Sequence, residues 1–389
     1  MAEFELNRTL KDIQQSAIRS FNDKISGIDG LIRLTLGEPD FPTPRFIKDA
    51  AIEAIDKSFN GYSHSRGEIE LREIISDYMN RHYDVKYDPE TEIIVTVGAT
   101  EALFTSLYAI LNPGDKVLVG APYYAVYKNF VTLAGGEFVP VNLREDHFLF
   151  TPEKLDTILS NDPAIKVLFL NHPSNPTGAT YNAEQLEGIA EVARKHNLII
   201  LSDEIYSELT YGDKHVSMAK FAPERTIVVN GASKSHSMTG WRMGFICAPE
   251  VFTSQIFKIH QAVVNAPSTQ AQYACIEGYS ERGDIEIDRM RNIYLERRNL
   301  IRDGMNRLGF ETSNPQGAFY LFVKVPDWFD GDDMDFCLDL AHKAKVGVVP
   351  GSAFGEDGKG YFRISYAAST NELNEFLNRV ETYIKETKD

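Results

Sequence analysis

The 389-residue sequence has few cysteines, a shortage of basic side chains and no long apolar run. Its three cysteines, Cys247, Cys275 and Cys337, are far apart and form no C-x-x-C pair. We therefore expect three buried free thiols, with neither a disulfide framework nor a metal site. Lys and Arg number 40 against 56 Asp and Glu, a formal net charge of −16, which disfavours partners such as nucleic acid or an anionic membrane. No window reaches the roughly 18 uninterrupted apolar residues of a membrane span.

The sequence lacks two further features, a signal peptide and the glycine motifs of nucleotide-binding folds, and each absence argues against a class of protein. The N-terminal stretch MAEFELNRTLKDIQQ lacks the basic start and apolar run of a signal peptide, and together with the odd number of cysteines this predicts a cytoplasmic location. The sequence contains neither G-x-G-x-x-G nor G-x-x-x-x-G-K-[ST]. Neither a dinucleotide-binding fold nor a P-loop is therefore supported.

Short apolar runs alternate with helical patterns from about Thr43 to Cys247. The runs EIIVTV, KVLVG, KVLFLN, NLIILS, RTIVVN and GFICAP are rich in Val, Ile and Leu, as expected of strands buried on both faces. This rhythm predicts an α/β fold with a mostly parallel sheet flanked by helices. We expect the first of these helices to begin with Thr43 as N-cap and Pro44 as its first residue.

The later sequence predicts a second, smaller domain. Helical stretches after Pro249 lead to AFYLFV, a helix near 333–345, VGVVP, FRISYA and a terminal helix from about 371 to 387, a pattern typical of an α+β unit. We predict a large domain over 45–283 and a small C-terminal domain over 284–389. The segment 1–44 is expected to pack with the small domain or with a partner chain.

Four candidate functional groups each follow a predicted strand. They are the turn Gly98-Ala99-Thr100, Asn175, Asp203 and Lys234. Ligands of open α/β sheets bind outside the carboxyl ends of parallel strands. If these strands share one sheet, the four groups converge on one crevice.

Each group also has an ordinary structural explanation. Lys234 could be a solvated loop lysine, Asp203 a helix N-cap and Asn175 a turn residue. Arg363 in YFRISYA could be an edge-strand arginine. Taken together, however, the amides after Gly98 can cradle a phosphate, a lysine can form an imine with an aldehyde, and a buried carboxylate can pair with a pyridinium. These three functions describe one cofactor, pyridoxal 5'-phosphate.

Eight motifs then give the sequence a family resemblance. LGEPDFPTP, GYSHSRGEIELRE, VTVGATEAL, APYYAVY, NHPSNPTG, SDEIYSEL, SKSHSMTGWRMG and FRISYA follow one another along the chain. In this order and spacing the sequence resembles the class I/II aminotransferases, which are fold-type I enzymes dependent on pyridoxal phosphate. The resemblance runs essentially end to end.

The resemblance implies a role for each matched position. Lys234 would hold the cofactor through an imine and then shuttle a proton, Asp203 would pair with the pyridine nitrogen, and Tyr206 would hydrogen-bond the ring's 3-oxygen together with Asn175. The other implied cofactor contacts are stacking by Tyr124, phosphate binding by Gly98, Ala99, Thr100, Ser233 and Arg242, and phosphate binding by Tyr62 from the other subunit of a homodimer with shared active sites. Arg363, with Asn175 and the Gly37 backbone, would bind the substrate α-carboxylate.

At three positions the family resemblance leaves the role of the residue in this chain open. Some relatives carry a phosphate-binding serine where this chain has Gly231, so Ser233 or Ser235 would have to supply a hydroxyl. Relatives that hold the ring-side carboxylate through a histidine have it where this chain has Tyr127, which leaves a hydrogen bond to Asp203 open. Arg66, beside Tyr62, could pair with a distal substrate carboxylate or be a solvated surface arginine.

The sequence thus predicts a transferase that acts in amino-acid metabolism, including biosynthesis. It would move an amino group from an L-amino acid to a 2-keto acid such as 2-oxoglutarate by ping-pong half-reactions. Aromatic amino acids are the favoured donors, while aspartate, alanine and an acylated diaminopimelate stay compatible. The alternatives are a carbon–sulfur β-lyase on the same cofactor and a non-catalytic cofactor-binding regulator. The second is disfavoured because regulators of this lineage carry an N-terminal basic DNA-binding domain, whereas the motifs here begin at Leu36.

Overall fold

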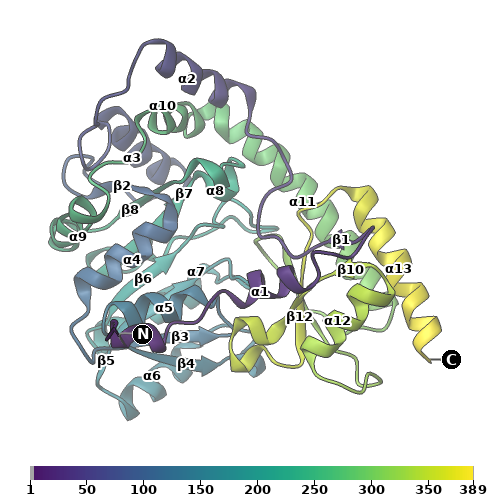
Figure 1. Ribbon diagram of the computed structural model, residues 1–389. Coiled ribbons are helices and arrows are strands. Elements are labelled where there is room, and N and C mark those ends of the chain that lie inside the picture. Colours follow the sequence, from purple (N-terminus) through teal and green to yellow (C-terminus); the bar gives the residue numbers. More distant parts are fainter. Residues whose placement is uncertain (1–3, 389) are drawn as a thin grey trace.

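The computed structural model describes residues 4–388 and is built around a seven-stranded sheet (Figure 1). The strand order is β2-β8-β7-β6-β5-β3-β4. The bounds of these strands are β2 Ile93–Val97, β3 Lys116–Ala121, β4 Glu137–Asn142, β5 Ile165–Asn171, β6 Ile199–Asp203, β7 Thr226–Gly231 and β8 Met243–Cys247. All neighbouring strands are parallel except β8, which is antiparallel to both β2 and β7. The predicted mostly parallel sheet is confirmed.

Helices cover both faces of this sheet, which explains why its strands are apolar throughout. Alternate residues of a strand enter different clusters: Ile94 and Ile246 pack on the face of α4, α5 and α9, whereas Val95 and Phe245 pack on the face of α3 and α10. The helices α6 and α7 cover the remainder of that second face. The bounds are α2 Arg45–Asp56, α3 Ile69–Tyr83, α4 Gly98–Ile110, α5 Val126–Leu133, α6 Pro152–Asn161, α7 Ala183–Lys195, α8 Ala232–Ser235, α9 Glu250–Val263 and α10 Thr269–Gly278.

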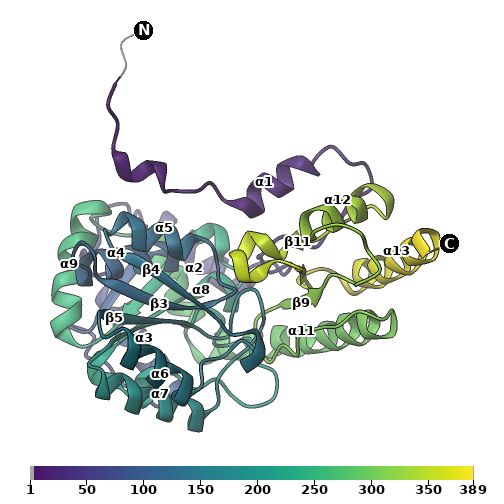
Figure 2. The same ribbon diagram turned by 90° about the horizontal axis from the view of Figure 1, so that it is seen from below.

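A second core is formed by a three-stranded antiparallel sheet of order β11-β12-β9. The long helix α11 runs from the seven-stranded sheet to this core, as both ribbon views show (Figures 1 and 2). The bounds are β9 Tyr320–Lys324, β10 Val346–Gly347, β11 Val349–Pro350, β12 Tyr361–Ser365, α11 Glu281–Arg307, α12 Asp333–Lys343 and α13 Thr370–Lys388.

The N-terminal segment joins this second core. Phe21 of α1 (Ala17–Lys24) and Leu34 lie in the same hydrophobic cluster as Phe336 and Phe376. The short strand β1 (Ile32–Arg33) pairs in parallel with β10. Before α1, the Gln14 carbonyl accepts a hydrogen bond from Asn129 of α5 at 2.9 Å, and the described residues that precede it extend away from the body of the molecule (Figure 2). The domain boundaries proposed from the sequence stay predictions.

The structure also corrects one local prediction and bears on two others. The helix α2 begins at Arg45 with Pro44 as N-cap, and the Thr43 hydroxyl instead donates to the Ser237 carbonyl at 2.7 Å. Thr43 is buried, so its hydroxyl makes this tertiary contact and does not cap the helix. All three cysteines are free and buried, as predicted. Within residues 4–388, no helix combines the length and apolar character required to cross a membrane.

Candidate active site

The carboxyl ends of four strands bring the predicted groups to one edge of the large sheet. The strands β5, β6 and β7 are parallel, and β2 runs in their direction because β8 is antiparallel to both β2 and β7. Gly98, Asp203 and Lys234 therefore follow strand ends on one side, with Asn175 in the loop after β5. The charges of Asp203, Arg242 and Arg363 all act on the Lys234 amine. The convergence inferred from the sequence is present.

Lys234 lies on the short helix α8, directly after the fully buried strand β7. Its Nζ donates to the Gly37 carbonyl at 2.6 Å. Burial lowers the pKa of the Lys234 amine to about 8, with the positive charges of Arg242 and Arg363 acting in the same direction. About a tenth of the amine is therefore uncharged at pH 7, far more than for a solvated lysine, and the uncharged amine is the nucleophilic form that imine chemistry needs.

Asp203 is the last residue of β6 and is buried. Its Oδ2 accepts a hydrogen bond from the Tyr127 hydroxyl at 2.8 Å, and its Oδ1 accepts the Ile205 amide at 3.2 Å. Burial nevertheless raises the pKa of Asp203 to about 6. A carboxylate this buried calls for a cationic partner. The question left open for Tyr127 is answered, because it supports Asp203.

The first turn of α4 and Arg242 form a cluster of donors. Gly98 has φ +74°, and a Cβ at this position would lie 2.5 Å from Arg242 Nη2. Arg242 Nη2 also lies 3.5 Å from the Thr100 hydroxyl. The free amides at the start of a helix, together with a guanidinium, are a site for a phosphate dianion.

Gly231 explains why the serine of some relatives is absent here. A Cβ at Gly231 would lie 2.6 Å from the Met243 carbonyl oxygen and 2.8 Å from Gly244 Cα. Ser235 Oγ lies 2.7 Å from His236 Nδ1, so this hydroxyl is engaged away from the donor cluster. Ser233 is buried on the same helix, and its role stays a prediction.

Arg363 is a buried cation at the junction of the two sheets. Its Nη1 donates to Asn175 Oδ1 at 2.9 Å and its Nη2 donates to the Thr35 carbonyl at 2.7 Å, while its buried Nε has no partner. No carboxylate among residues 4–388 is paired with it in a salt bridge. A buried guanidinium with neutral partners and a free donor is suited to bind an incoming carboxylate.

Three tyrosines complete the centre of the site. Tyr206, predicted from the sequence, is buried, and its hydroxyl lies 2.7 Å from that of Tyr320. Tyr320 was not predicted: it stands in AFYLFV, where an aromatic residue is an ordinary strand residue. Tyr124 is partly buried, and its ring packs edge-on against Tyr127 with centroids 5.6 Å apart.

Two predicted residues lie away from this centre. Tyr62 is 89% exposed in the loop between α2 and α3, beside a surface groove that also includes Asn60, Pro267 and Gln270. Within one chain it does not contribute to the site. The Arg66 guanidinium donates to the Thr91 carbonyl at 3.1 Å and stacks 4.6 Å from the Phe257 ring centroid. These contacts give Arg66 a structural position.

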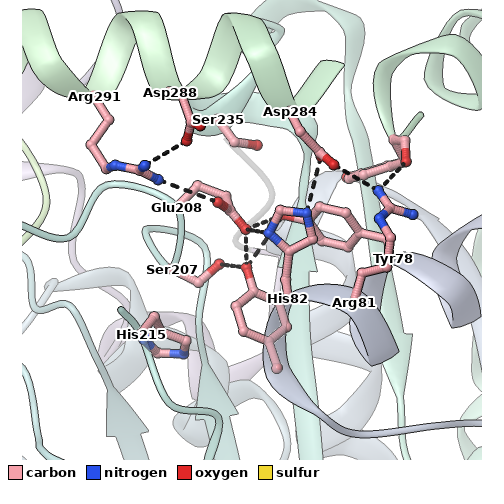
Figure 3. Close-up of polar contacts among 12 residues, drawn as sticks. Tyr78, Arg81, His82, Ser207, Glu208, His215, Ser235, Asp284, Asp288 and Arg291 are labelled. Atoms are coloured by element: carbon pink, nitrogen blue, oxygen red, sulfur yellow. Dashed lines mark hydrogen bonds and ion pairs between the residues drawn. The ribbon is translucent and has the colours of Figure 1, made fainter. Parts of the chain in front are cut away.

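A separate polar cluster lies between α3, the loop after β6 and α11 (Figure 3). Glu208 is buried at its centre and accepts hydrogen bonds from the hydroxyls of Tyr78 and Tyr83. His82 Nδ1 lies 3.2 Å from Glu208, and His82 Nε2 lies 3.0 Å from Asp284 of α11. The Tyr83 hydroxyl also lies 2.7 Å from the hydroxyl of Ser207, the residue directly after Tyr206. This cluster therefore fixes the loop that carries Tyr206.

One further trio has ligand atoms close enough to hold a metal ion: His172, Glu204 and His215. Glu204 already accepts hydrogen bonds from His215 at 3.0 Å, from the hydroxyls of Ser202 and Ser217, and from the Met218 amide. Burial lowers the pKa of His172 to about 3, so its ring is neutral. The hydrogen bonds account for the trio, and the expectation of no metal stays a prediction.

Comparison with known proteins agrees with this geometry. The profile of the family described as "Aminotransferase class I and II" matches residues 29–380. The chain is 39% identical over 387 residues to the probable N-acetyl-LL-diaminopimelate aminotransferase of Bacillus subtilis, covering 100% of this chain and 98% of the relative. It is also 39% identical to aromatic-amino-acid aminotransferase 2 of Thermococcus litoralis, covering 98% and 99% of the two chains. The solved structure of aspartate aminotransferase from Thermus thermophilus with maleate matches with a TM-score of 0.92 at 36% identity, covering 98% and 100%.

The chain belongs to the class I and II aminotransferases. The family prediction, the fold-type I architecture and the assignment as an aminotransferase of amino-acid metabolism are confirmed. The names of these relatives favour an aminotransferase over the carbon–sulfur β-lyase that was the alternative.

Proposed function

We propose that this protein binds pyridoxal 5'-phosphate at the edge formed by Lys234, Asp203 and Arg242, and uses it to transfer amino groups. The observation that carries the proposal is the partly neutral Lys234 amine, whose pKa is about 8, placed in one buried site with Asp203 and two arginines. Each element has a matching group on the cofactor: the amine for the aldehyde, the carboxylate for the ring nitrogen and the α4 donors for the phosphate. The residues therefore fit the cofactor.

When bound, the cofactor supplies an electron sink for the negative charge that deprotonation leaves on the substrate α-carbon. Asp203 holds a positive charge on the ring nitrogen, and Tyr127 fixes the carboxylate that does so. Tyr206 orients the ring through its hydroxyl. Lys234 would move a proton between the substrate α-carbon and C4′ of the cofactor, as a general base and acid whose pKa is close to the operating pH. Gly98, Ala99, Thr100 and Arg242 hold the phosphate, and Tyr124 covers the ring.

The substrate carboxylate binds to Arg363 in this proposal. Its partners Asn175 and Thr35 orient the guanidinium from two sides. Arg363 lies over the ring of Phe354 at 4.9 Å, and Phe354 belongs to an apolar cluster against which Ile18, Phe148 and Tyr361 pack. We infer an L-amino acid donor with an aromatic side chain and 2-oxoglutarate as acceptor. The names of two relatives, an aromatic-amino-acid and an aspartate aminotransferase, keep aspartate as the second candidate donor.

The test is a panel of amino donors against 2-oxoglutarate, with the absorbance of the bound cofactor followed in each half-reaction. We expect Lys234→Ala to lower turnover by at least about 10²–10⁴-fold, the usual value of a general acid–base group. Lys214→Ala, at an exposed lysine on another loop, is the matched control and should leave turnover unchanged. Near-normal transamination by Lys234→Ala would refute the assignment.

We also propose a cytoplasmic homodimer with shared sites. Support comes from Tyr62, which is 89% exposed on the large-domain surface, and from the exposed apolar side chains of Phe4 and Leu6 in the extended N-terminal segment. Mixing Lys234→Ala with Tyr62→Ala chains should regenerate one intact site in each mixed dimer, about a quarter of all sites in an equal mixture. Light scattering measures the dimer, and the absence of any recovered activity after mixing would contradict the shared site.

A further inference from the structure

Tyr320 occupies the point where the three-stranded sheet meets the cofactor edge of the large sheet. It opens β9 and is 1% exposed. In the antiparallel register, Tyr320 faces Ser365 on β12, two residues from Arg363. Because side chains alternate with a period of two, Tyr320 and Arg363 are diagonal neighbours on one face of the small sheet.

Tyr320 contacts three parts of the proposed site. Its hydroxyl lies 2.7 Å from the hydroxyl of Tyr206, in the loop that follows β6 of the large sheet. The Arg363 guanidinium lies 4.2 Å from the centroid of its ring. A Cβ added to Gly37 would lie 2.4 Å from the Tyr320 hydroxyl, and the Gly37 carbonyl accepts the Lys234 amine.

We propose that Tyr320 is a positioning residue that orients the Tyr206 hydroxyl toward the cofactor and supports the face of Arg363. This inference rests on the proposed function, because it assigns Tyr206 to the cofactor ring. Tyr320 thereby links the half of the site that holds the cofactor to the half that holds the substrate carboxylate.

The hydrogen bond between the two hydroxyls can run in either direction, and the role proposed for Tyr206 selects one. Burial raises the pKa of both Tyr206 and Tyr320, so each phenol keeps one proton to donate. If Tyr206 donates to the 3-oxygen of the ring, its own oxygen is free to accept from Tyr320. Such a chain polarises the Tyr206 hydroxyl and strengthens its bond to the negatively charged oxygen.

The ring and the hydroxyl of Tyr320 have separable effects. A cation over an aromatic face within about 6 Å is attracted to the ring quadrupole, so the phenylalanine ring would still support Arg363. Only the hydroxyl group of Tyr320 contacts Tyr206 and lies against Gly37. Tyr320→Phe therefore removes the link to the cofactor and keeps the contact with the substrate-binding arginine.

The experiment follows the pH midpoint of the absorbance change of bound pyridoxal phosphate in the holoenzyme. Loss of a donor to the ring oxygen favours the protonated cofactor and moves this midpoint upward. A net hydrogen bond corresponds to about 0.3–1 pH unit, so we expect an upward shift of that size in Tyr320→Phe. Tyr206→Phe should shift the midpoint further, and the double variant should match Tyr206→Phe alone.

Steady-state constants provide the second measurement. Tyr320→Phe should lower kcat several-fold with KM for the amino donor unchanged, whereas Tyr320→Leu, which removes the ring, should also raise KM. Tyr108→Phe, at an exposed tyrosine of α4 away from the site, is the matched control and should change neither midpoint nor constants. If Tyr320→Phe does not fold, Gly37→Ala displaces the same hydroxyl and should move the midpoint in the same direction.

The outcomes separate this inference from the proposed function. An unchanged midpoint in Tyr320→Phe, or shifts that add in the double variant, would overturn the role of Tyr320 while the cofactor is still bound. A wild-type protein that takes up no pyridoxal phosphate would instead overturn the proposed function.

Discussion

Arg363 combines full burial with partners that carry no charge. Its contacts are the Asn175 amide oxygen and the Thr35 carbonyl, and its Nε is unpaired. Replacing it by alanine removes a charge-assisted hydrogen bond to the α-carboxylate that contributes about 1.5–3 kcal/mol. We expect Arg363→Ala to lower kcat/KM by roughly 10–150-fold, mainly through KM, for every amino acid tested. Arg45→Ala, at an exposed arginine, is the control, and a loss confined to one substrate would contradict the role.

Burial of the Asp203 carboxylate lowers the stability of the cofactor-free protein. Its folded-state pKa is raised to about 6 from an ordinary value of 3.8, so the cofactor-free protein loses stability as the pH rises between these values. Asp203→Asn should therefore stabilise the cofactor-free protein at pH 7 by about 1–3 kcal/mol. The same variant should bind pyridoxal phosphate more weakly, because the cation on the ring loses its partner.

Urea unfolding of the cofactor-free protein measures the first effect, and titration with pyridoxal phosphate measures the second. Asp23→Asn, at an exposed aspartate, serves as control for both. Destabilisation of the cofactor-free Asp203→Asn protein would show that the carboxylate is compensated without the cofactor.

The residues found from the sequence and those missed differ in one respect. Lys234, Asp203 and Asn175 follow strand ends, so position in the chain already marks them as lying at a ligand edge. Tyr320, the residue that was missed, lies within a regular element, and its partner Tyr206 is 114 residues away in the sequence. No local pattern distinguishes such an aromatic residue from an ordinary core residue.

The junction of β7, α8 and β8 illustrates a constraint at the level of elements. Gly231 lies against the backbone of β8, with the Met243 carbonyl and Gly244 Cα in the space of a side chain. We expect Gly231→Ser, the residue of some relatives, to destabilise the protein by about 1–3 kcal/mol through overpacking and to give no gain in phosphate binding. Gly27→Ser, where nothing lies within 4 Å, is the control. Tm and cofactor affinity are the measurements, and tighter binding by Gly231→Ser would contradict this account.

Element type could be predicted more reliably than element ends or edge strands. The start of α7 (Ala183–Lys195) is marked in the sequence, because Asn182 and Gln185 form a capping box there. The strand β4 was not predicted, since EFVPVN is partly exposed and contains Pro140, a residue that tends to exclude the strand assignment. The edge strand β4 lacks the apolar run that identified the other strands, including β2 at the opposite edge.

At the scale of the whole molecule, strand order could not be predicted from the sequence. Nothing in GFICAP indicates that β8 lies between β2 and β7 and runs against both. The composition of a strand reports its burial and not its neighbours. The cluster around Glu208 could not be predicted for the same reason, because its residues come from elements far apart in the sequence: α3, the loop after β6 and α11.

That cluster predicts how the stability of the whole molecule depends on pH. His82 is partly buried, and although burial opposes its protonation, Asp284 and Glu208 raise its pKa to about 9. A raised pKa stabilises the fold fully below the unfolded value of 6.5, and this contribution is lost as the pH rises to about 9. We expect the free energy of unfolding of His82→Gln to fall by about 1–2 kcal/mol less than that of the wild type between pH 6 and pH 9. Urea unfolding at the two pH values measures this difference. His342→Gln, at an exposed position, should keep the wild-type decline, and an equally steep decline in His82→Gln would assign the pH dependence to other groups.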